Sequence, residues 1–145
     1  MAELLKSWQA WALLSAACAA LTAVFAKVGI ASIGSDYATF IRTVVILAVL
    51  GALLTVTGQW QAPSTVSART WLFLVLSGIA TGASWLCYFR ALKLGDAARV
   101  APIDKLSVVL VAVFGVAFLG ERLSAANWLG VAMIAAGAVL VAFKG

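Results

Sequence analysis

The sequence predicts an all-α membrane protein, an integral bundle of five transmembrane helices. Apolar residues make up 65% of its 145 residues and charged residues only 10%, against about 45–50% and about 25% in soluble domains. A water-soluble fold of this length has too much surface to bury so many apolar side chains. The charges are also spaced so that five mostly apolar stretches approach the roughly 20 residues with which a helix crosses a bilayer. We therefore expect a single five-helix membrane domain over residues 1–145.

The first three spans are expected at residues 8–29, 37–57 and 70–92. The apolar stretch after Lys6 is longer than the roughly 7–15 apolar residues of a signal peptide, so we interpret it as a span. A signal sequence cleaved at residues 17–20 is the alternative. Residues 58–69, between the second and third spans, contain Pro63 and several hydroxyl residues, a composition typical of a solvated loop.

The fourth and fifth spans are expected at residues 98–119 and 125–143. Pro102 lies near the start of the fourth span. Because proline has no N–H and clashes with the preceding turn, it bends or loosens a helix. We expect a hinge at Pro102; if the helix begins later in the sequence, the proline only marks its first turn.

The distribution of basic residues predicts how the chain is oriented. Five spans place the two termini on opposite sides of the membrane. One face carries Lys6, Arg69 and Arg122, and the other carries Lys27, Arg90, Lys93, Arg99 and Lys144, with Arg42 and Lys105 just inside the spans. Because cytoplasmic loops are enriched in Lys and Arg, we expect the N-terminus outside and the C-terminus inside, in the inner membrane. The difference is small, so a second, inverted population is the alternative.

The residue types that the chain lacks argue against enzyme chemistry. There is no His, and the five acids stand singly at positions 3, 36, 96, 104 and 121, which does not suggest a catalytic carboxylate pair. Cys18 and Cys87 lie in apolar stretches without metal-binding or redox spacing. We expect no catalytic residues, no metal and no cofactor. The net charge of +5 is interpreted as membrane topology and not as nucleic-acid binding.

Three charged residues are expected at a similar depth inside the spans. Arg42, Asp104 and Lys105 lie about five or six residues, roughly 8–10 Å, beyond the start of the second and fourth spans. Asp104 is expected to pair with Arg42 or Lys105, and Arg42 is favoured because adjacent helical residues point about 100° apart. The group forms either a polar gate on a substrate path or a set of cations that reach lipid headgroups. For the shallower Lys27, Arg90 and Lys93 we favour headgroup contacts.

Hydroxyl and aromatic residues recur along the third span. Ser77, Thr81, Ser84 and Tyr88 follow one another at helical steps of four, three and four, and Trp85 lies beside them. This stripe is interpreted as the lining of a cavity for a small amphipathic ligand. The alternative is tight helix packing, which the Gly78-x-x-x-Gly82 pattern on the same helix supports.

The second half of the chain resembles the EamA-type domain of the drug/metabolite transporter superfamily. The resemblance rests on residues 91–95 (ALKLG), 100–103 (VAPI) and 118–124 (FLGERLS), followed by Trp128, Gly130 and Gly137. Members commonly have ten helices in two halves of opposite orientation, and this chain resembles a single half, as in the five-span bacterial and archaeal members.

The resemblance implies a secondary transporter, an exporter of small metabolites or drugs that works by alternating access between two copies. An antiparallel homodimer is the first expectation; a parallel dimer or a partner of opposite orientation stays open. Arg42 and Lys105 would offer positive charge to an anionic or zwitterionic substrate, and Asp104 is the candidate for proton coupling. The carboxylate that small multidrug-resistance relatives carry in their first helix is missing here. A component of a lipid-linked sugar flippase and a non-transporting membrane subunit are the alternatives.

Overall fold

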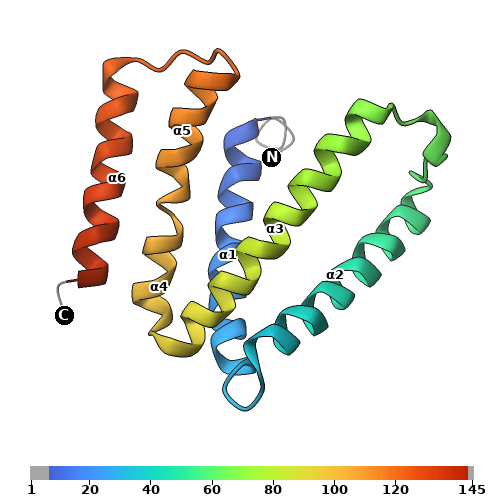
Figure 1. Cartoon of the computed structure of the whole chain (residues 1–145), viewed down its shortest axis with the longest axis horizontal. Coiled ribbons are helices and arrows are strands. Elements are labelled where there is room, and N and C mark those ends of the chain that lie inside the picture. Colours follow the sequence, from blue (N-terminus) through green and yellow to red (C-terminus); the bar gives the residue numbers. More distant parts are fainter. Residues whose placement is uncertain (1–6, 144–145) are drawn as a thin grey trace. The chain divides into compact units, whose positions relative to one another are not determined.

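The structure is a computed structural model that describes residues 7–143 of the chain (Figure 1). Lys6 and Lys144, which enter the prediction of orientation, lie outside these residues. The elements in chain order are α1 (Trp8–Gly29), α2 (Ser35–Thr57), the 3₁₀ turn η2 (Pro63–Thr65), α3 (Ala68–Leu94), α4 (Ala97–Asp104), α5 (Ser107–Phe118) and α6 (Ala125–Phe143).

The five predicted spans are confirmed. Over residues 7–143, five helical segments are long and apolar enough to cross a membrane: Trp8–Gly29, Ser35–Thr57, Ala68–Leu94, Ala97–Phe118 and Ala125–Phe143. Their bounds follow the predicted ones closely, because the charged and loop-forming residues that interrupt the apolar stretches also end the helices. The all-helical fold class is therefore confirmed for the part of the chain that the structure describes.

A serine caps the start of three of these helices. The Oγ atoms of Ser7, Ser67 and Ser124 each accept a hydrogen bond from the backbone N–H three residues later, at 3.3, 3.1 and 3.2 Å. Each serine stands directly before the first residue of α1, α3 or α6. A serine at this position satisfies one of the N–H groups that a helix start leaves without a partner. These serines therefore explain where the helices begin.

Two glycines with positive φ mark the ends of α2 and α5. Gly58 (φ 65°) follows α2, and there the N–H of Gln59 donates to Leu54 O at 3.1 Å and that of Gly58 to Thr55 O at 3.4 Å, which is a Schellman motif. Gly120 (φ 70°) follows α5. Residues with a side chain rarely adopt this conformation, so glycine allows both helices to stop sharply.

The fourth span is interrupted between α4 and α5. The N–H of Leu106 donates to Ile103 O and that of Val108 to Lys105 O, both at 3.0 Å. These bonds join residues three apart and form a tighter 3₁₀ turn in place of an α-helical one. Pro102 lies inside α4, where its missing N–H affects the preceding turn. The interruption thus lies near the hinge expected at Pro102, but it follows the turn that the proline itself perturbs.

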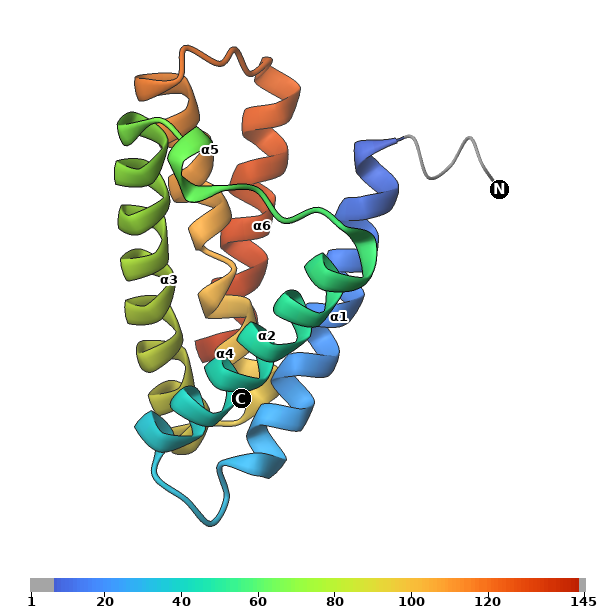
Figure 2. The ribbon, with the colours of Figure 1, turned by 90° about the vertical axis from the view of Figure 1, so that its right-hand side faces the viewer.

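The chain forms two compact units, residues 26–93 and residues 7–25 with 94–143. In the first unit, α2 and α3 approach each other at the Ser35 and Leu94 ends and diverge toward the Gly58–Ser67 loop (Figures 1 and 2). The buried side chains of this unit gather at the same end; they are Ala26, Ile30, Ala38, Thr39, Phe89 and Leu92. In the second unit, α6 packs against α4 and α5.

Most large apolar side chains of the helices remain exposed on the single chain. Leu47 and Val56 of α2 are 72% and 86% exposed, and Leu74 of α3 is 61% exposed. Water would disfavour such surfaces, whereas lipid tails or apolar helices of another subunit cover them without cost. The exposure fits the spans inferred from hydropathy.

Candidate functional site

Arg42 of α2 lies against two aromatic rings of α3. Its guanidinium carbon is 4.1 Å from the centroid of the Trp85 ring and 5.5 Å from that of Phe89. Trp85 and Phe89 are four residues apart, so they present one face of α3 to the arginine. Phe89 is only 2% exposed. The cluster of Arg42, Trp85 and Phe89 is called the arginine–aromatic cluster below.

The arginine–aromatic cluster holds a positive charge well inside its span. Arg42 stands seven residues after Ser35, the first residue of α2, which corresponds to about 10 Å along the helix axis. A planar guanidinium stacks on aromatic faces better than a lysine ammonium does. Such contacts contribute about 0.5–2 kcal/mol, depending on how far water is excluded. The two rings therefore fix where the charge of Arg42 lies.

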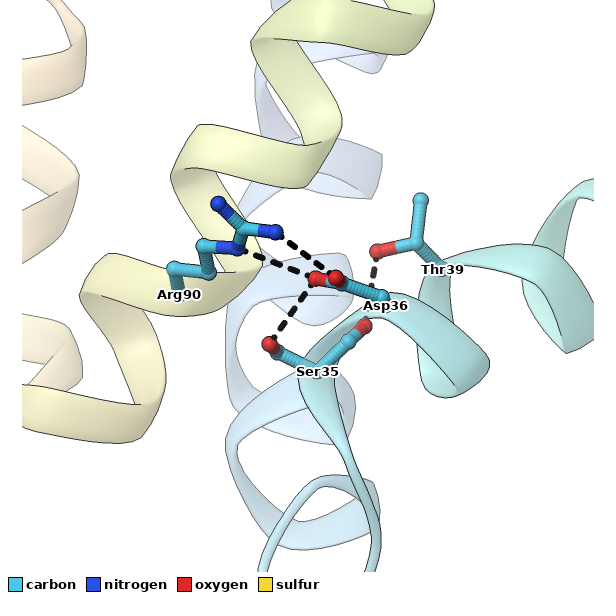
Figure 3. A network of polar contacts seen from close by, with 4 residues as sticks. All are labelled: Ser35, Asp36, Thr39 and Arg90. Carbon is cyan, nitrogen blue, oxygen red and sulfur yellow. Dashed lines mark hydrogen bonds and ion pairs between the residues drawn. The ribbon is translucent and has the colours of Figure 1, made fainter.

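A second polar contact joins the start of α2 to the end of α3 (Figure 3). Arg90 donates from Nε to Asp36 Oδ1 at 3.0 Å and from Nη2 to Asp36 Oδ2 at 2.7 Å. Ser35 Oγ donates to Asp36 Oδ1 at 3.2 Å, and Thr39 Oγ1 donates to the Ser35 carbonyl at 2.9 Å. Two parallel hydrogen bonds give the ion pair a defined geometry. Its side chains are 62% and 55% exposed, so the pair orients the helix ends more than it stabilises the fold.

Two lysines tie the loop between α1 and α2 to the C-terminal end of α3. Lys27 Nζ donates to Leu92 O at 2.7 Å. Lys93 Nζ donates to Ile30 O at 3.2 Å and also to Ile33 O. An ammonium group near the last carbonyls of a helix is favoured by the helix dipole. The shallow positions of Lys27, Arg90 and Lys93 predicted contacts with lipid headgroups; in the structure all three bind oxygens of the chain itself.

Asp104 and Lys105 form an ion pair at the interruption between α4 and α5. Lys105 Nζ lies 3.2 Å from Asp104 Oδ2. The sequence favours Arg42 as the partner of Asp104, whereas the structure shows the contact with Lys105, the other candidate. Asp104 stands seven residues after Ala97, the first residue of α4, again about 10 Å along its helix. Arg42 and Asp104 thus stand equally far along α2 and α4, seven residues after the first residue of each helix.

The structure divides the residues of the predicted stripe on α3. Trp85 contacts Arg42, and Tyr88 packs near the Phe89 ring, at 6.5 Å between ring centroids. Thr81 Oγ1 instead donates to the Ser77 carbonyl at 2.9 Å, so this hydroxyl satisfies its own helix. Ser77, Thr81 and Ser84 are exposed on α3.

The two glycines of this helix do not serve close packing inside their own unit. A methyl group added at Gly78 or Gly82 would meet no atom of residues 26–93 within 4 Å. Packing against a neighbouring helix, the alternative explanation for the small residues of α3, is therefore not used within this unit.

Asp36 and Phe89 are the functional candidates that sequence reasoning missed. From the sequence, Asp36 is identified only as one of five single acids, and Phe89 is not named. A signal for Asp36 was present, since it starts the second span while Arg90 ends the third. Antiparallel neighbouring helices bring such positions to the same level, where opposite charges pair. Phe89 is separated by one helical turn from Trp85, which identifies a shared face.

No metal-binding group is found in the described part of the chain. Among residues 7–143, no set of three or more His, Cys, Asp or Glu side chains lies close enough to hold an ion. The polar chemistry that the structure offers is thus positive charge beside aromatic rings, with two ion pairs near helix ends.

Comparison with known proteins gives three results. The sequence profile described as the EamA-like transporter family matches residues 6–143. A protein of Sinorhizobium sp., described as an uncharacterized transporter in the cobO 3' region, is 74% identical over 137 residues, or 94% of this chain and 97% of that protein. ArnE of Proteus mirabilis (strain HI4320), described as a probable 4-amino-4-deoxy-L-arabinose-phosphoundecaprenol flippase subunit, is 28% identical over 108 residues, or 68% of this chain and 96% of the subunit. No solved structure matches the chain.

Proposed function

Because the chain belongs to the EamA-like transporter family, we propose that it is a secondary transporter that exports small metabolites or drugs across the inner membrane. The family match confirms the resemblance predicted from motifs within residues 91–137, and the five apolar helices make the chain a multi-pass membrane protein. The similarity to a protein described as a transporter over nearly the whole of both chains supports transport as the activity.

The observation that carries the proposal is the arginine–aromatic cluster. A charge about 10 Å inside a span is costly unless it faces protein, water or a ligand, and such charges mark transport pathways. Arg42 is held there by Trp85 and Phe89. On this basis α2 and α3 line the substrate path, with Tyr88 beside Arg42 and with Ser77, Thr81 and Ser84 further along α3.

Two copies of the chain are proposed to build the complete path. Five helices enclose too little space for alternating access, whereas paired repeats place a binding site between them near the middle of the membrane. An antiparallel homodimer is the first candidate and a parallel one the second. The interruption after α4, with Pro102 before it and the Asp104–Lys105 pair at its edge, supplies a position where the fourth span bends.

Reconstitution tests this function directly. Purified protein is placed in liposomes loaded with a metabolite extract, and efflux is followed by mass spectrometry. Wild type is expected to release particular metabolites, and Arg42→Ala and Lys105→Ala are expected to slow that release about tenfold, the effect of losing a hydrogen bond to a charged group. Arg69→Ala, which removes an arginine at the other end of α3, is the matched control. Equal efflux from wild type and both folded variants contradicts the proposed path.

The orientation of the two copies has its own test. Single cysteines at positions 3 and 144 are labelled from each side of the membrane in a background without Cys18 and Cys87. In an antiparallel dimer both cysteines are labelled from both sides of the membrane. In a parallel dimer each cysteine is labelled from one side only. In a separate experiment, the protein is diluted without crosslinker until each liposome holds a single copy. Transport by these liposomes would contradict the dimer.

A component of a lipid-linked sugar flippase is the second candidate. It is supported by the similarity to the ArnE subunit, which spans 96% of that subunit. This candidate requires a second gene product, so reconstituted efflux by the purified chain alone argues against it. Purification as a stable homodimer whose melting temperature responds to a metabolite also argues against a non-transporting subunit.

A further inference from the structure

Residues 26–93 carry many more basic than acidic side chains. Lys27, Arg42, Arg69, Arg90 and Lys93 are basic, and Asp36 is the single acid in this range. The acid is held by Arg90 through two hydrogen bonds. Lys27 and Lys93 donate to backbone carbonyls of Leu92, Ile30 and Ile33. Asp36, the acid of this range, thus pairs with Arg90, and neither Arg42 nor Arg69 has an acid partner among residues 26–93.

Arg42 presents its N–H groups without an acceptor in this unit. The guanidinium carbon of Arg42 lies over the aromatic rings of Trp85 and Phe89. Hydrogen bonds from a guanidinium leave along its edge, and within residues 26–93 no oxygen atom accepts one from Arg42. The rings position the group while its donors remain available. Lys105, the other cation considered for substrate binding, already pairs with Asp104.

A positive charge about 10 Å along its span, with no acid beside it among residues 26–93, needs a counter-charge from outside this unit. A carboxylate or a phosphate matches the guanidinium edge, because both accept two parallel hydrogen bonds. The aromatic rings of Trp85 and Phe89 next to the guanidinium favour an apolar or aromatic body on the ligand. A cation would be repelled by Arg42, and a neutral molecule would leave the charge uncompensated.

We infer that Arg42 is the recognition site for the anionic group, a carboxylate or a phosphate, of an amphipathic ligand. If the chain transports metabolites as proposed above, this ligand is the substrate, and the exported compounds are organic anions. The same chemistry also describes the phosphate of an anionic lipid headgroup. The two sources make different predictions in a membrane of defined composition.

The test measures binding of 2-naphthoate, 2-naphthyl phosphate and the neutral 2-naphthamide by equilibrium dialysis. The full chain is placed in nanodiscs of phosphatidylcholine and, separately, in nanodiscs containing phosphatidylglycerol. Wild type is compared with Arg42→Gln, Arg42→Lys and Arg69→Gln. Arg69 is the matched control because it also lies over an aromatic ring, at 6.0 Å from Phe73 on the same helix. Size-exclusion profiles and circular dichroism confirm that each variant is folded.

In phosphatidylcholine, wild type and Arg69→Gln are expected to bind both anions, and Arg42→Gln is expected to bind them about tenfold more weakly or not at all. Arg42→Lys keeps the charge but loses the planar fork, so an intermediate affinity is expected. Competition of phosphatidylglycerol with naphthoate in wild type identifies the lipid headgroup as the source of the anion. Unchanged naphthoate binding in phosphatidylglycerol identifies a soluble ligand.

Three results overturn the inference. The first is equal binding of naphthamide and naphthoate, and the second is equal binding of naphthoate by wild type and Arg42→Gln. The third is that wild type binds no naphthoate and also shows no binding of phosphatidylglycerol that depends on Arg42. Anion binding at Arg42 without efflux from liposomes leaves the site standing and refutes transport. Efflux without anion preference refutes the site and leaves transport standing.

Discussion

Arg90 and Asp36, which are 54 positions apart in the sequence, form a bidentate ion pair with hydrogen bonds of 3.0 and 2.7 Å. The pair lies where α2 begins and α3 ends, close to the two lysines that hold the loop between α1 and α2. This end of residues 26–93 is therefore fixed by several polar contacts, while α2 and α3 diverge toward the loop that joins them (Figures 1 and 2).

Exchanging the two charges tests whether the pair orients the helix ends. Asp36→Arg or Arg90→Asp alone places like charges together, so each variant is expected to melt at a lower temperature than wild type and to exchange the amides of residues 30–36 faster. The double exchange restores opposite charges and should recover most of both properties. If the double variant loses as much melting temperature as the two single variants together, the two charges are not coupled.

Phe89→Ala is expected to destabilise the protein more than Phe73→Ala. Phe89 is 2% exposed and lies beneath Arg42, and removing a buried phenylalanine costs about 3 kcal/mol or more. Phe73, on the same helix, is 59% exposed, so its removal should cost about 0.5 kcal/mol or less. The measurement is reversible unfolding in mixed detergent micelles. Similar costs for the two residues would contradict a packed cluster at Arg42.

The effect of Gly115→Ala on stability is expected to depend on the side chain at position 121. A methyl group added at Gly115 would lie 2.5 Å from Glu121 Oε2, so Gly115→Ala must displace the glutamate side chain from α5. In a Glu121→Ala background the clash is absent, and Gly115→Ala should stabilise the helix by up to about 1 kcal/mol. Thermal unfolding of the four proteins measures this difference. Gly130→Ala, which meets no atom within 4 Å, serves as the control and should show no dependence on residue 121.

Pro102→Ala is expected to strengthen α4 without joining it to α5. The substitution supplies an N–H for the Ala98 carbonyl and removes the clash of the ring with the preceding turn. The 3₁₀ bonds around Lys105 and Leu106 lie after that turn and should persist. Hydrogen exchange is expected to slow at residues 99–102 and to stay fast at residues 105–108. Slower exchange across both stretches would show that the proline causes the interruption.

The five spans could be predicted because their determinants are local. Charged residues are excluded from the middle of a span by the cost of burying them in lipid, so their spacing marks the helices. Serine before α1, α3 and α6, and glycine after α2 and α5, add start and stop signals that act within a few residues.

The candidate site could be predicted only in part, because its contacts join helices. Depth and helical spacing single out Arg42 and Trp85, and the structure brings these two residues together. The choice of Trp85 and Phe89 as the partners of Arg42 depends on which faces of α2 and α3 meet, and periodicity alone does not give that. The pairing of Asp104 with Lys105 follows from flexible side chains that bend toward each other despite diverging Cα–Cβ directions.

The hydrogen bonds from Lys27 to Leu92 and from Lys93 to Ile30 have a consequence for biosynthesis. The two residues in each bond are 65 and 63 positions apart. The end of α1 and the loop after it therefore lack these bonds until α3 has been translated. At about 5–20 residues per second, the ribosome needs several seconds to supply the missing donors and acceptors. During that interval the segment of α1 and α2 lacks both hydrogen bonds, and the Lys27 ammonium group and the Ile30 carbonyl depend on water or lipid at the insertion site.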